Sequence, residues 1–274
     1  MGKFDGCLLA CDIDGTLVYD NLLPERNIEK IKYFVGQGGR FALSTGRTVQ
    51  ALSFVTSKID CIAPSVLSNG CVIYDFENKK TVFEKLLSKR ATEMAEEVIG
   101  AVGVGVEMHT ADIVYVPKRS DMTDLHQQYE SMQAEFTDAK TAAAKNINKI
   151  IYFLEKEEQR RAVYGIAEKY KEECVFYNTG ISINGLQQNY IEQMPTGVSK
   201  AEALKKLCGI LGIKDGKFFA IGDYYNDVEM LKCADISAAP LEAPEDVKIA
   251  ASTVVGSAAE GAVADFIEYL EEIF

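Results

Sequence analysis

Positive charge is scarce in this sequence. Its 274 residues include 29 lysines and arginines against 41 aspartates and glutamates, which gives a net charge of −12. A standing nucleic-acid partner needs a basic protein face against its phosphates, so the deficit argues against one. It leaves a small phosphorylated molecule open, because a local cation, lysine or arginine can outweigh a distant acidic surface.

Long apolar runs are also missing. No stretch has the length of uninterrupted apolar residues that a membrane-spanning helix needs. The first residues, Met1–Gly6, lead directly into an apolar segment without the pattern of a signal peptide. We therefore expect no membrane partner and a cytoplasmic location.

Paired cysteine motifs are absent. The cysteines number seven, none forms a C-x-x-C pair, and most lie inside apolar runs. Free buried thiols in a reducing compartment explain this usage better than a disulfide framework or a metal site.

Three common ligand-binding motifs are absent as well, because residues that they require are missing. The glycines at 36–39 would need a further glycine where Phe41 stands to make a dinucleotide fingerprint. No glycine-rich phosphate loop precedes Lys200. A calcium loop that began at Asp12 would have Leu17 where glycine is required.

The most informative stretch that is present begins at Leu8. Leu8–Cys11 predicts a buried strand, and Asp12 and Asp14 follow it two residues apart. Side chains alternate along a strand, so we expect both carboxylates on one side, where a cation such as Mg²⁺ would relieve their repulsion. An ordinary acidic turn, or a receiver-type acidic pocket, explains these residues equally well unless partners appear downstream.

Such partners follow two further predicted strands. The apolar residues 41–43 run into Ser44–Arg47, and residues 218–221 run into Gly222–Asp227. Strands joined by helices in this way are parallel neighbours, which places Thr45 beside Asp12 at one sheet edge. A helix after Arg47 would offer backbone N–H groups to a phosphate, although an ordinary N-cap at Thr45 fits too.

Lys200 is placed against local preference. Ser199 is a good N-cap for a helix over the following residues, so Lys200 falls in its first turn. The helix dipole disfavours a cation there, which hints at a function.

The middle of the chain, residues 84–190, mixes helical and strand patterns and carries no motif of its own. Its histidines, His109 and His126, receive no role. We expect it to be a module inserted into a core made of residues 1–83 and 191–274.

Taken together, the motifs resemble those of a known family. The chain resembles the haloacid dehalogenase (HAD) superfamily hydrolases. The resemblance rests on the motifs DxDGT at Asp12–Thr16 and GDxxND at Gly222–Asp227, with Ser44–Arg47 and Lys200 between them. The similarity covers nearly the whole chain and points to the Cof-like branch, subclass IIB with a C2-type cap. It implies an α/β fold in which a Rossmann-like parallel-sheet core is catalytic and an inserted α+β cap sets substrate specificity.

The resemblance also implies an activity. Members of this kind are Mg²⁺-dependent phosphatases, and here the substrate would be a small phosphorylated metabolite such as a sugar phosphate. Asp12 would be the nucleophile that forms an aspartyl-phosphate, and Asp14 the general acid and base. The remaining implied roles are phosphate binding by Thr45, Gly46, Lys200 and Asn226; metal binding by Asp12, Asp14, Asp223 and Asp227; and substrate or cap contact by Ser44, Arg47 and Asn69.

Several alternatives stay open at this point. Ser44 could replace Thr45 as the hydroxyl that binds phosphate, Asp227 could act through a water, and Asn69 could serve only its turn. A phosphotransferase or mutase resembling phosphomannomutase uses similar motifs, and a non-catalytic phospho-ligand sensor could share the fold. We expect a monomer or a weak homodimer.

Overall fold

The computed structural model describes residues 2–183 and 186–274. The chain divides into two compact units. The first consists of Met1–Gly46, Leu52–Phe83 and Ser199–Phe274, and the second of Arg47–Ala51 and Glu84–Val198. Among the described residues, no helix is both long and apolar enough to cross a membrane.

A five-stranded parallel sheet forms the centre of the first unit, with the strand order β14-β13-β12-β1-β2. Its strands are β1 (Leu8–Cys11), β2 (Arg40–Leu43), β12 (Phe218–Ile221), β13 (Ile236–Ala239) and β14 (Thr253–Val254). β1 and β12 are buried along their whole length, as expected for short apolar runs covered on both faces. The prediction that the strands after Leu8 and Phe41 are parallel neighbours is confirmed.

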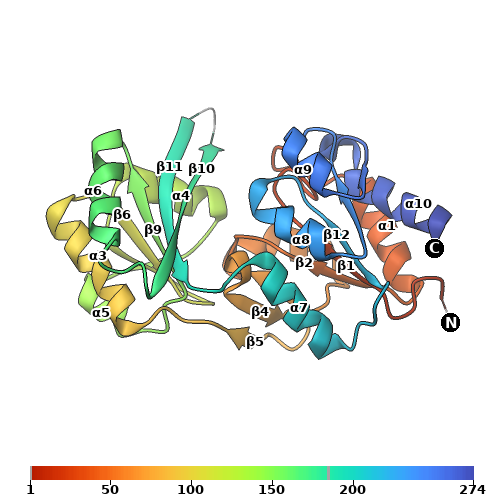
Figure 1. Ribbon diagram of the computed structural model, residues 1–274, viewed down its shortest axis with the longest axis horizontal. Coiled ribbons are helices and arrows are strands. Elements are labelled where there is room, and N and C mark those ends of the chain that lie inside the picture. The colour runs from red at the N-terminus through yellow and green to blue at the C-terminus, as the bar shows by residue number, and fades with distance from the viewer. Residues whose placement is uncertain (1, 184–185) are drawn as a thin grey trace. The chain divides into compact units, whose positions relative to one another are not determined.

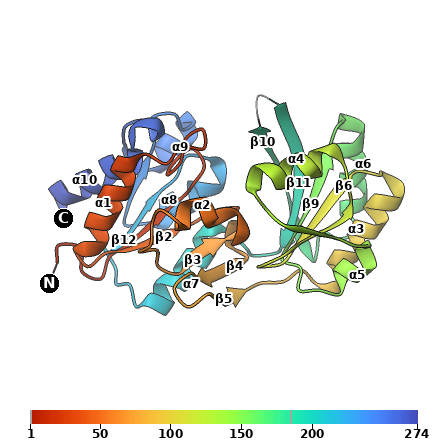
Figure 2. The same ribbon diagram turned by 180° about the vertical axis from the view of Figure 1, so that it is seen from behind.

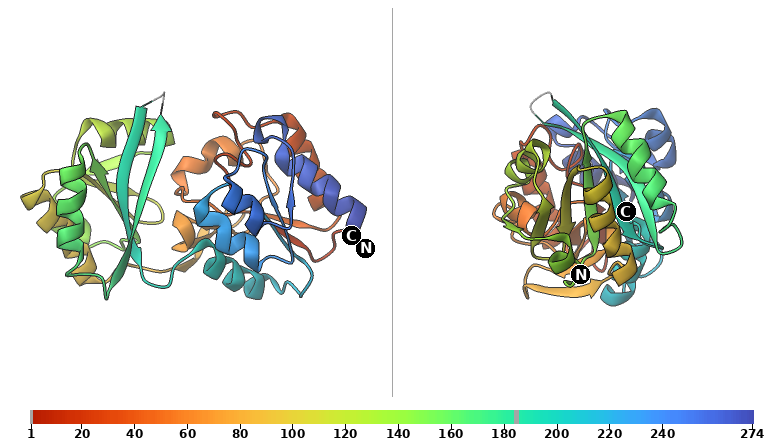
Figure 3. Two further views of the ribbon diagram at one scale, coloured as in Figure 1. Left: turned by 45° about the horizontal axis from the view of Figure 1, so that its top comes forward. Right: turned by 90° about the vertical axis from the view of Figure 1, so that its left-hand side faces the viewer.

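Helices cover both faces of this sheet (Figure 1). They are α1 (Glu25–Gly36), α2 (Ser53–Thr56), α7 (Lys200–Leu211), α8 (Val228–Cys233), α9 (Glu245–Ala250) and α10 (Ala262–Ile273). α7, α8 and α9 pack apolar side chains against Leu8, Ala10 and Ala220 on one face. α1 and α10, from opposite ends of the chain, lie side by side (Figures 1 and 3).

A small antiparallel sheet adjoins β2 in the first unit. It contains β3 (Ser65–Leu67), β4 (Val72–Asp75) and β5 (Lys80–Glu84), in that order. An isolated bridge between Ser44 and Val66 joins it to the end of β2. Four short 3-10 helices complete the described elements: η1 (Gln50–Leu52), η2 (Ser68–Gly70), η3 (Tyr225–Asp227) and η4 (Ala258–Glu260).

The second unit is a six-stranded sheet with the order β10-β11-β9-β6-β7-β8. Its strands are β6 (Gly105–His109), β7 (Val114–Lys118), β8 (Ala134–Phe136), β9 (Lys149–Leu154), β10 (Cys174–Ile183) and β11 (Leu186–Pro195). Its helices are α3 (Lys89–Ala101), α4 (Asp121–Glu130), α5 (Ala139–Ala143) and α6 (Glu157–Ala167). α3, α5 and α6 pack on one face against a core that includes Met108 and Tyr152, and α4 lies on the other face (Figures 1 and 2).

The unit boundaries differ from the expected ones at two places. The second unit continues to Val198 rather than ending at residue 190, because β11 runs to Pro195 and pairs with β10 along its whole length. The five residues Arg47–Ala51 also group with the second unit, although the strand before them belongs to the first. The sequence offers no composition change at either place.

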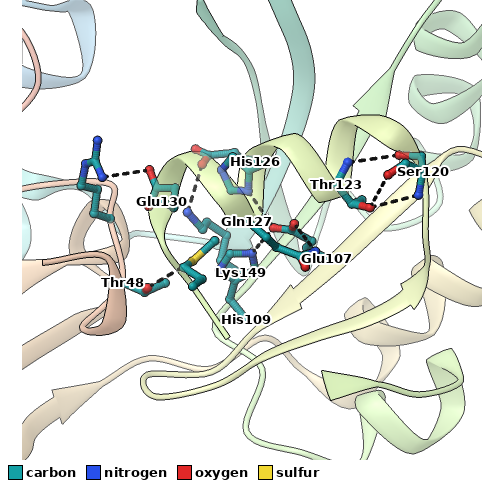
Figure 4. A network of polar contacts seen from close by, with 12 residues as sticks. Thr48, Glu107, His109, Ser120, Thr123, His126, Gln127, Glu130 and Lys149 are labelled. Carbon is teal, nitrogen blue, oxygen red and sulfur yellow. Dashed lines mark hydrogen bonds and ion pairs between the residues drawn. The ribbon is translucent and has the colours of Figure 1, made fainter. Parts of the chain in front are cut away.

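A buried polar cluster lies between α4 and the sheet of the second unit (Figure 4). The Glu107 carboxylate contacts His109 Nε2 and His126 Nδ1, each at 3.0 Å, and accepts a hydrogen bond from Gln127 at 3.1 Å. Glu107 is fully buried, so these three contacts replace its lost hydration. They tie α4 to β6.

The pKa values of the two histidines in this cluster shift in opposite directions, and that of Glu107 is lowered. Burial opposes the ionised form of Glu107, but the charge of His126 and hydrogen bonds from both histidines lower its pKa. Burial also opposes a charged His126, but Glu107 and Glu130 outweigh it and raise that pKa. Burial, with the nearby charge of Lys149, lowers the pKa of His109 to about 4. Below the ordinary histidine pKa of about 6.5 the cluster therefore holds one carboxylate–imidazolium pair, between Glu107 and His126.

We predict that Glu107→Gln destabilises the fold most below neutral pH. The raised pKa of His126 means that its charge stabilises the native state fully below the ordinary histidine pKa of about 6.5 and less as the pH rises through the folded value. We expect a loss of about 3–5 kcal/mol at pH 6, because one partner of a buried pair is removed. The loss should shrink by pH 9, measured by urea unfolding.

The matched control is Glu97→Gln in the same unit, whose carboxylate pairs with Lys169 near the surface. This variant should lose little stability and show no change between the two pH values. An equal loss at pH 6 and pH 9 for Glu107→Gln would contradict the charged pair.

Candidate active site

Three aspartates meet where β1 and β12 end. These strands are parallel neighbours with Cys11 opposite Ile221, so the residues that follow them emerge at the same edge of the sheet. The backbone N–H of Asp12 donates to the carbonyl of Ile221 at 3.0 Å. Carboxylate oxygens of Asp12, Asp223 and Asp227 all lie within 4.8 Å of one another.

A buried lysine joins this group from α7. Ser199 caps the helix by accepting a hydrogen bond from the N–H of Glu202, as predicted, and Lys200 is therefore its first residue. Its Nζ donates to Asp12 Oδ1 at 2.6 Å and to Asp227 Oδ1 at 2.7 Å. Burial opposes the ammonium, but these two carboxylates outweigh it and raise the pKa of Lys200.

One ammonium does not balance three carboxylates. Burial raises the pKa of Asp12 well above its usual range; the charges of Asp227, Asp223 and Asp14 add to this rise, and Lys200 only partly offsets it. Burial and the charge of Asp227 raise the pKa of Asp223 to about 6. A hard divalent cation would favour the ionised forms, and carboxylate oxygens are the ligands that Mg²⁺ prefers. The donor set therefore fits Mg²⁺.

The three aspartates differ in how free their oxygens are. Asp227 accepts the ammonium of Lys200 on Oδ1 and the backbone N–H of Tyr224 on Oδ2, the latter at 3.1 Å. Asp223 accepts the hydroxyl of Thr16 at 2.9 Å. Asp12 and Asp223 are thus better placed to bind a cation directly. Asp227 instead binds the ammonium of Lys200 and the backbone of the turn at Tyr224.

Two glycines let these carboxylates approach the backbone. Gly15 has a φ of +81°, and a Cβ there would lie 2.4 Å from Asp223 Oδ2. A Cβ on Gly222 would lie 2.5 Å from Asp227 Cγ. Any side chain at either position would push a carboxylate out of the group, which explains the glycine in each motif.

The segment after β2 reaches the same edge. Ser44 and Thr45 are both buried, and the backbone of Thr45 bonds to Val66 and Asn69. The hydroxyl of Ser44 has no hydrogen-bond partner among the described residues. The hydroxyl of Ser44 is thus open to a phosphate oxygen, and the structure does not decide between Ser44 and Thr45.

Asparagines cross-link the neighbouring turns. Asn226 Nδ2 donates to Asn69 Oδ1 at 3.3 Å, and Asn69 lies beside Gly46, where a Cβ would be 3.1 Å from its amide. Asn69 has a φ of 53°, in the left-handed region, so it serves its turn as well. The structure therefore brings Gly46, Asn69 and Asn226 together.

Two expectations about local geometry are wrong. β1 ends at Cys11, so Asp12 and Asp14 lie beyond the strand, and the alternation argument does not apply. Asp12 is buried whereas Asp14 is exposed. The helix expected after Arg47 starts later than predicted: residues 46–49 are irregular, and the short η1 and α2 follow, so no helix N-terminus directly follows the turn to face a phosphate there.

Arg47 groups with a different unit from the other predicted residues. It belongs to the second unit, where its guanidinium pairs with Glu130 at 3.6 Å. Sequence reasoning also missed the bond from Thr16 to Asp223 and the cluster of Glu107 with two histidines. Thr16 was visible in the DxDGT motif, but no sequence signal marked Glu107 or Glu130.

Comparisons with known proteins agree with this architecture. A 5-amino-6-(5-phospho-D-ribitylamino)uracil phosphatase of Bacillus subtilis is 25% identical over 281 residues, which cover 96% of this chain and 97% of the relative. A haloacid dehalogenase-like hydrolase from Bacteroides thetaiotaomicron superposes with a TM-score of 0.84 at 22% identity, over 98% of this chain and 100% of that one. A HAD subclass IIB sugar phosphatase gives 0.81 at 20% identity, over 97% and 99%.

The sequence profile of one family spans nearly the whole chain. It matches residues 9–267, which include both ends of the acidic site as well as the second unit between them. This chain belongs to the haloacid dehalogenase-like hydrolases.

Proposed function

We propose that this protein is a Mg²⁺-dependent phosphatase that hydrolyses a small phosphorylated metabolite through an aspartyl-phosphate on Asp12. The observation that carries this proposal is the convergence of Asp12, Asp223, Asp227 and Lys200 at the ends of β1 and β12. A buried carboxylate held by a lysine, beside acids that fit a metal, is suited to attack a phosphate ester.

The chemistry divides into two displacements. In the first, an oxygen of Asp12 bonds to phosphorus and the ester oxygen leaves with a proton from Asp14. In the second, water attacks the aspartyl-phosphate, Asp14 accepts a proton from that water, and Asp12 is regenerated with release of inorganic phosphate. Mg²⁺ held by Asp12, Asp223 and the main-chain carbonyl of Asp14 would reduce the repulsion between the anionic nucleophile and its anionic substrate.

The remaining residues have supporting roles. The ammonium of Lys200 pairs with Asp12 and would also donate a hydrogen bond to a phosphate oxygen. The hydroxyl of Thr45 or Ser44, the amide of Asn226 and the backbone N–H at Gly46 would donate to the other phosphate oxygens. Asp227 fixes Lys200 in place. We assign the choice of the organic group to the second unit, residues 47–51 and 84–198, because the catalytic motifs lie in the first.

A sugar or polyol phosphate is the proposed substrate class. The Bacillus subtilis relative is named for a substrate whose phosphate sits on a ribityl chain, and a structural neighbour is named a sugar phosphatase. A panel of sugar, polyol and nucleotide phosphates, assayed with Mg²⁺ for released phosphate, tests the proposal. Failure to hydrolyse any of them, or return of an isomer instead of phosphate, would refute it.

We predict that Asp12→Asn reduces kcat by more than about 1000-fold, because an amide cannot form the acyl-phosphate. The change preserves shape, so circular dichroism should remain that of the wild type. Asp20→Asn, an exposed acid in the loop after the motif, is the matched control and should keep its activity. Near wild-type turnover by Asp12→Asn would remove Asp12 as the nucleophile.

We also predict that EDTA abolishes activity and that Mg²⁺ restores it. Independently of turnover, Mg²⁺ at about 100 times its Kd should stabilise the wild type by about 2.7 kcal/mol in thermal or urea unfolding. Asp223→Asn should lose most of this stabilisation, since one of the two freer carboxylates is gone. Full activity in metal-free buffer would exclude the proposed metal.

A further inference from the structure

A buried asparagine on α1 bonds to the loop that carries the DxDGT motif. Asn27 is fully buried, and its Nδ2 donates to the main-chain carbonyl of Leu17 at 3.1 Å. Leu17 is itself fully buried, so its carbonyl cannot bond to water and needs a donor from the protein. Asn27 supplies that donor from the first turn of α1.

The oxygen of the same amide bonds to the C-terminal helix. Asn27 Oδ1 accepts the backbone N–H of Ala264, in the first turn of α10, at 3.0 Å. The N-cap residue of α10 is Gly261, which has no side chain to cap the helix, so Asn27 acts as a capping oxygen from outside. A Cβ on Gly261 would lie 3.2 Å from this oxygen. Both ends of the amide are therefore engaged, which fixes its orientation.

Ion pairs independently hold α1 against α10. The guanidinium of Arg26 pairs with Asp265 and Glu268, and Lys30 Nζ lies 3.1 Å from Glu268. These side chains are partly exposed, so each pair alone adds little stability. Together with the packing of the two helices side by side (Figure 3), they hold Asn27 in a fixed place.

The loop that receives the bond from Asn27 is compact. The N–H of Val18 donates to the carbonyl of Ile13 at 2.8 Å, and the N–H of Gly15 donates to the carbonyl of Val18 at 2.9 Å. Ile13, Leu17 and Val18 are all buried. A shift at Leu17 would therefore also move its neighbours in the loop.

One of these neighbours bonds to a proposed metal ligand. Thr16 is fully buried, and its hydroxyl donates to Asp223 Oδ1 at 2.9 Å. Thr16 and Leu17 are adjacent, so this part of the loop is held at two points. The hydroxyl of Thr16 joins it to Asp223, and the carbonyl of Leu17 joins it to Asn27.

From these contacts we propose that Asn27 is a positioning residue for Asp223 and acts on it through Leu17 and Thr16. The inference rests on the proposed function, since it assigns Asp223 to Mg²⁺. Groups that bond to a metal ligand orient it, and their loss typically weakens metal binding by about 10- to 100-fold. The amide of Asn27 makes α10, which lies outside both motifs, part of what sets the affinity for the cation.

The test is calorimetric titration of the full chain with Mg²⁺ alone. Asn27→Leu keeps the approximate size of the side chain but removes both of its hydrogen bonds. We expect its Kd for Mg²⁺ to be about 5- to 10-fold weaker than that of the wild type, in the range of known couplings between separate sites. Asn27→Ser, whose shorter side chain reaches neither partner, should show the same weakening if Asn27→Leu fails to fold. An unchanged Kd would overturn the inference.

Arg26→Met is the matched control. Arg26 stands next to Asn27 on α1 and pairs with Asp265 and Glu268 of α10, but it does not contact the loop. The variant should be less stable than the wild type and bind Mg²⁺ with the same Kd. If it weakened Mg²⁺ binding as much as Asn27→Leu does, helix docking in general would be the cause, and the role given to Asn27 would be wrong.

A double-mutant cycle tests the route through Thr16. If Asn27 acts on Asp223 through the hydroxyl of Thr16, then Thr16→Val and Thr16→Val/Asn27→Leu should bind Mg²⁺ equally weakly. Additive losses would overturn this route.

Turnover of the ester panel is measured separately from Mg²⁺ binding. A wild type that binds Mg²⁺ but hydrolyses nothing would refute the proposed function and leave the comparison of variants intact. A wild type that binds no Mg²⁺ would overturn both.

Discussion

The salt-bridged Lys200 is the interaction on which the site depends. Three carboxylates cannot gather in a buried place at the end of a sheet without positive charge, and Lys200 supplies the only ammonium seen within hydrogen-bond reach of Asp12 and Asp227 among the described residues. Its helix, α7, begins at Lys200 directly after the Ser199 cap, so the lysine lies in the first turn of a helix that packs on the sheet beside α8 and α9. The remaining negative charge is what makes the place suited to a divalent cation and a phosphate ester.

The strand order of the first unit explains why distant motifs meet. β1 lies between β2 and β12, so the residues after all three strands emerge at one edge. Gly15 and Gly222 then let Asp223 and Asp227 lie against the backbone of the neighbouring turn. The DxDGT and GDxxND motifs are thus two halves of one packed structure. Each glycine leaves room for an aspartate carboxylate, and Gly15 also has the positive φ that glycine adopts without strain.

The second unit holds its own buried charges in a different way. Glu107 is shared between two histidines and a glutamine, so one carboxylate ties β6 to α4, while Lys149 pairs with Glu192 nearby on the sheet. This polar interior fixes α4 in place, and α4 carries the partners of Arg47.

The sequence by itself determined the strands, the caps and the acids. Leu8–Cys11 and Phe218–Ile221 could be recognised as buried strands because both faces are apolar, and Ser199 as an N-cap because a hydroxyl satisfies local N–H groups. Only the tertiary structure decided where β1 ends, that Arg47 joins the second unit, and that Glu107 meets two histidines. Local patterns follow from the backbone's own hydrogen bonds, whereas buried charges are paired by neighbours that the chain brings from far along its length.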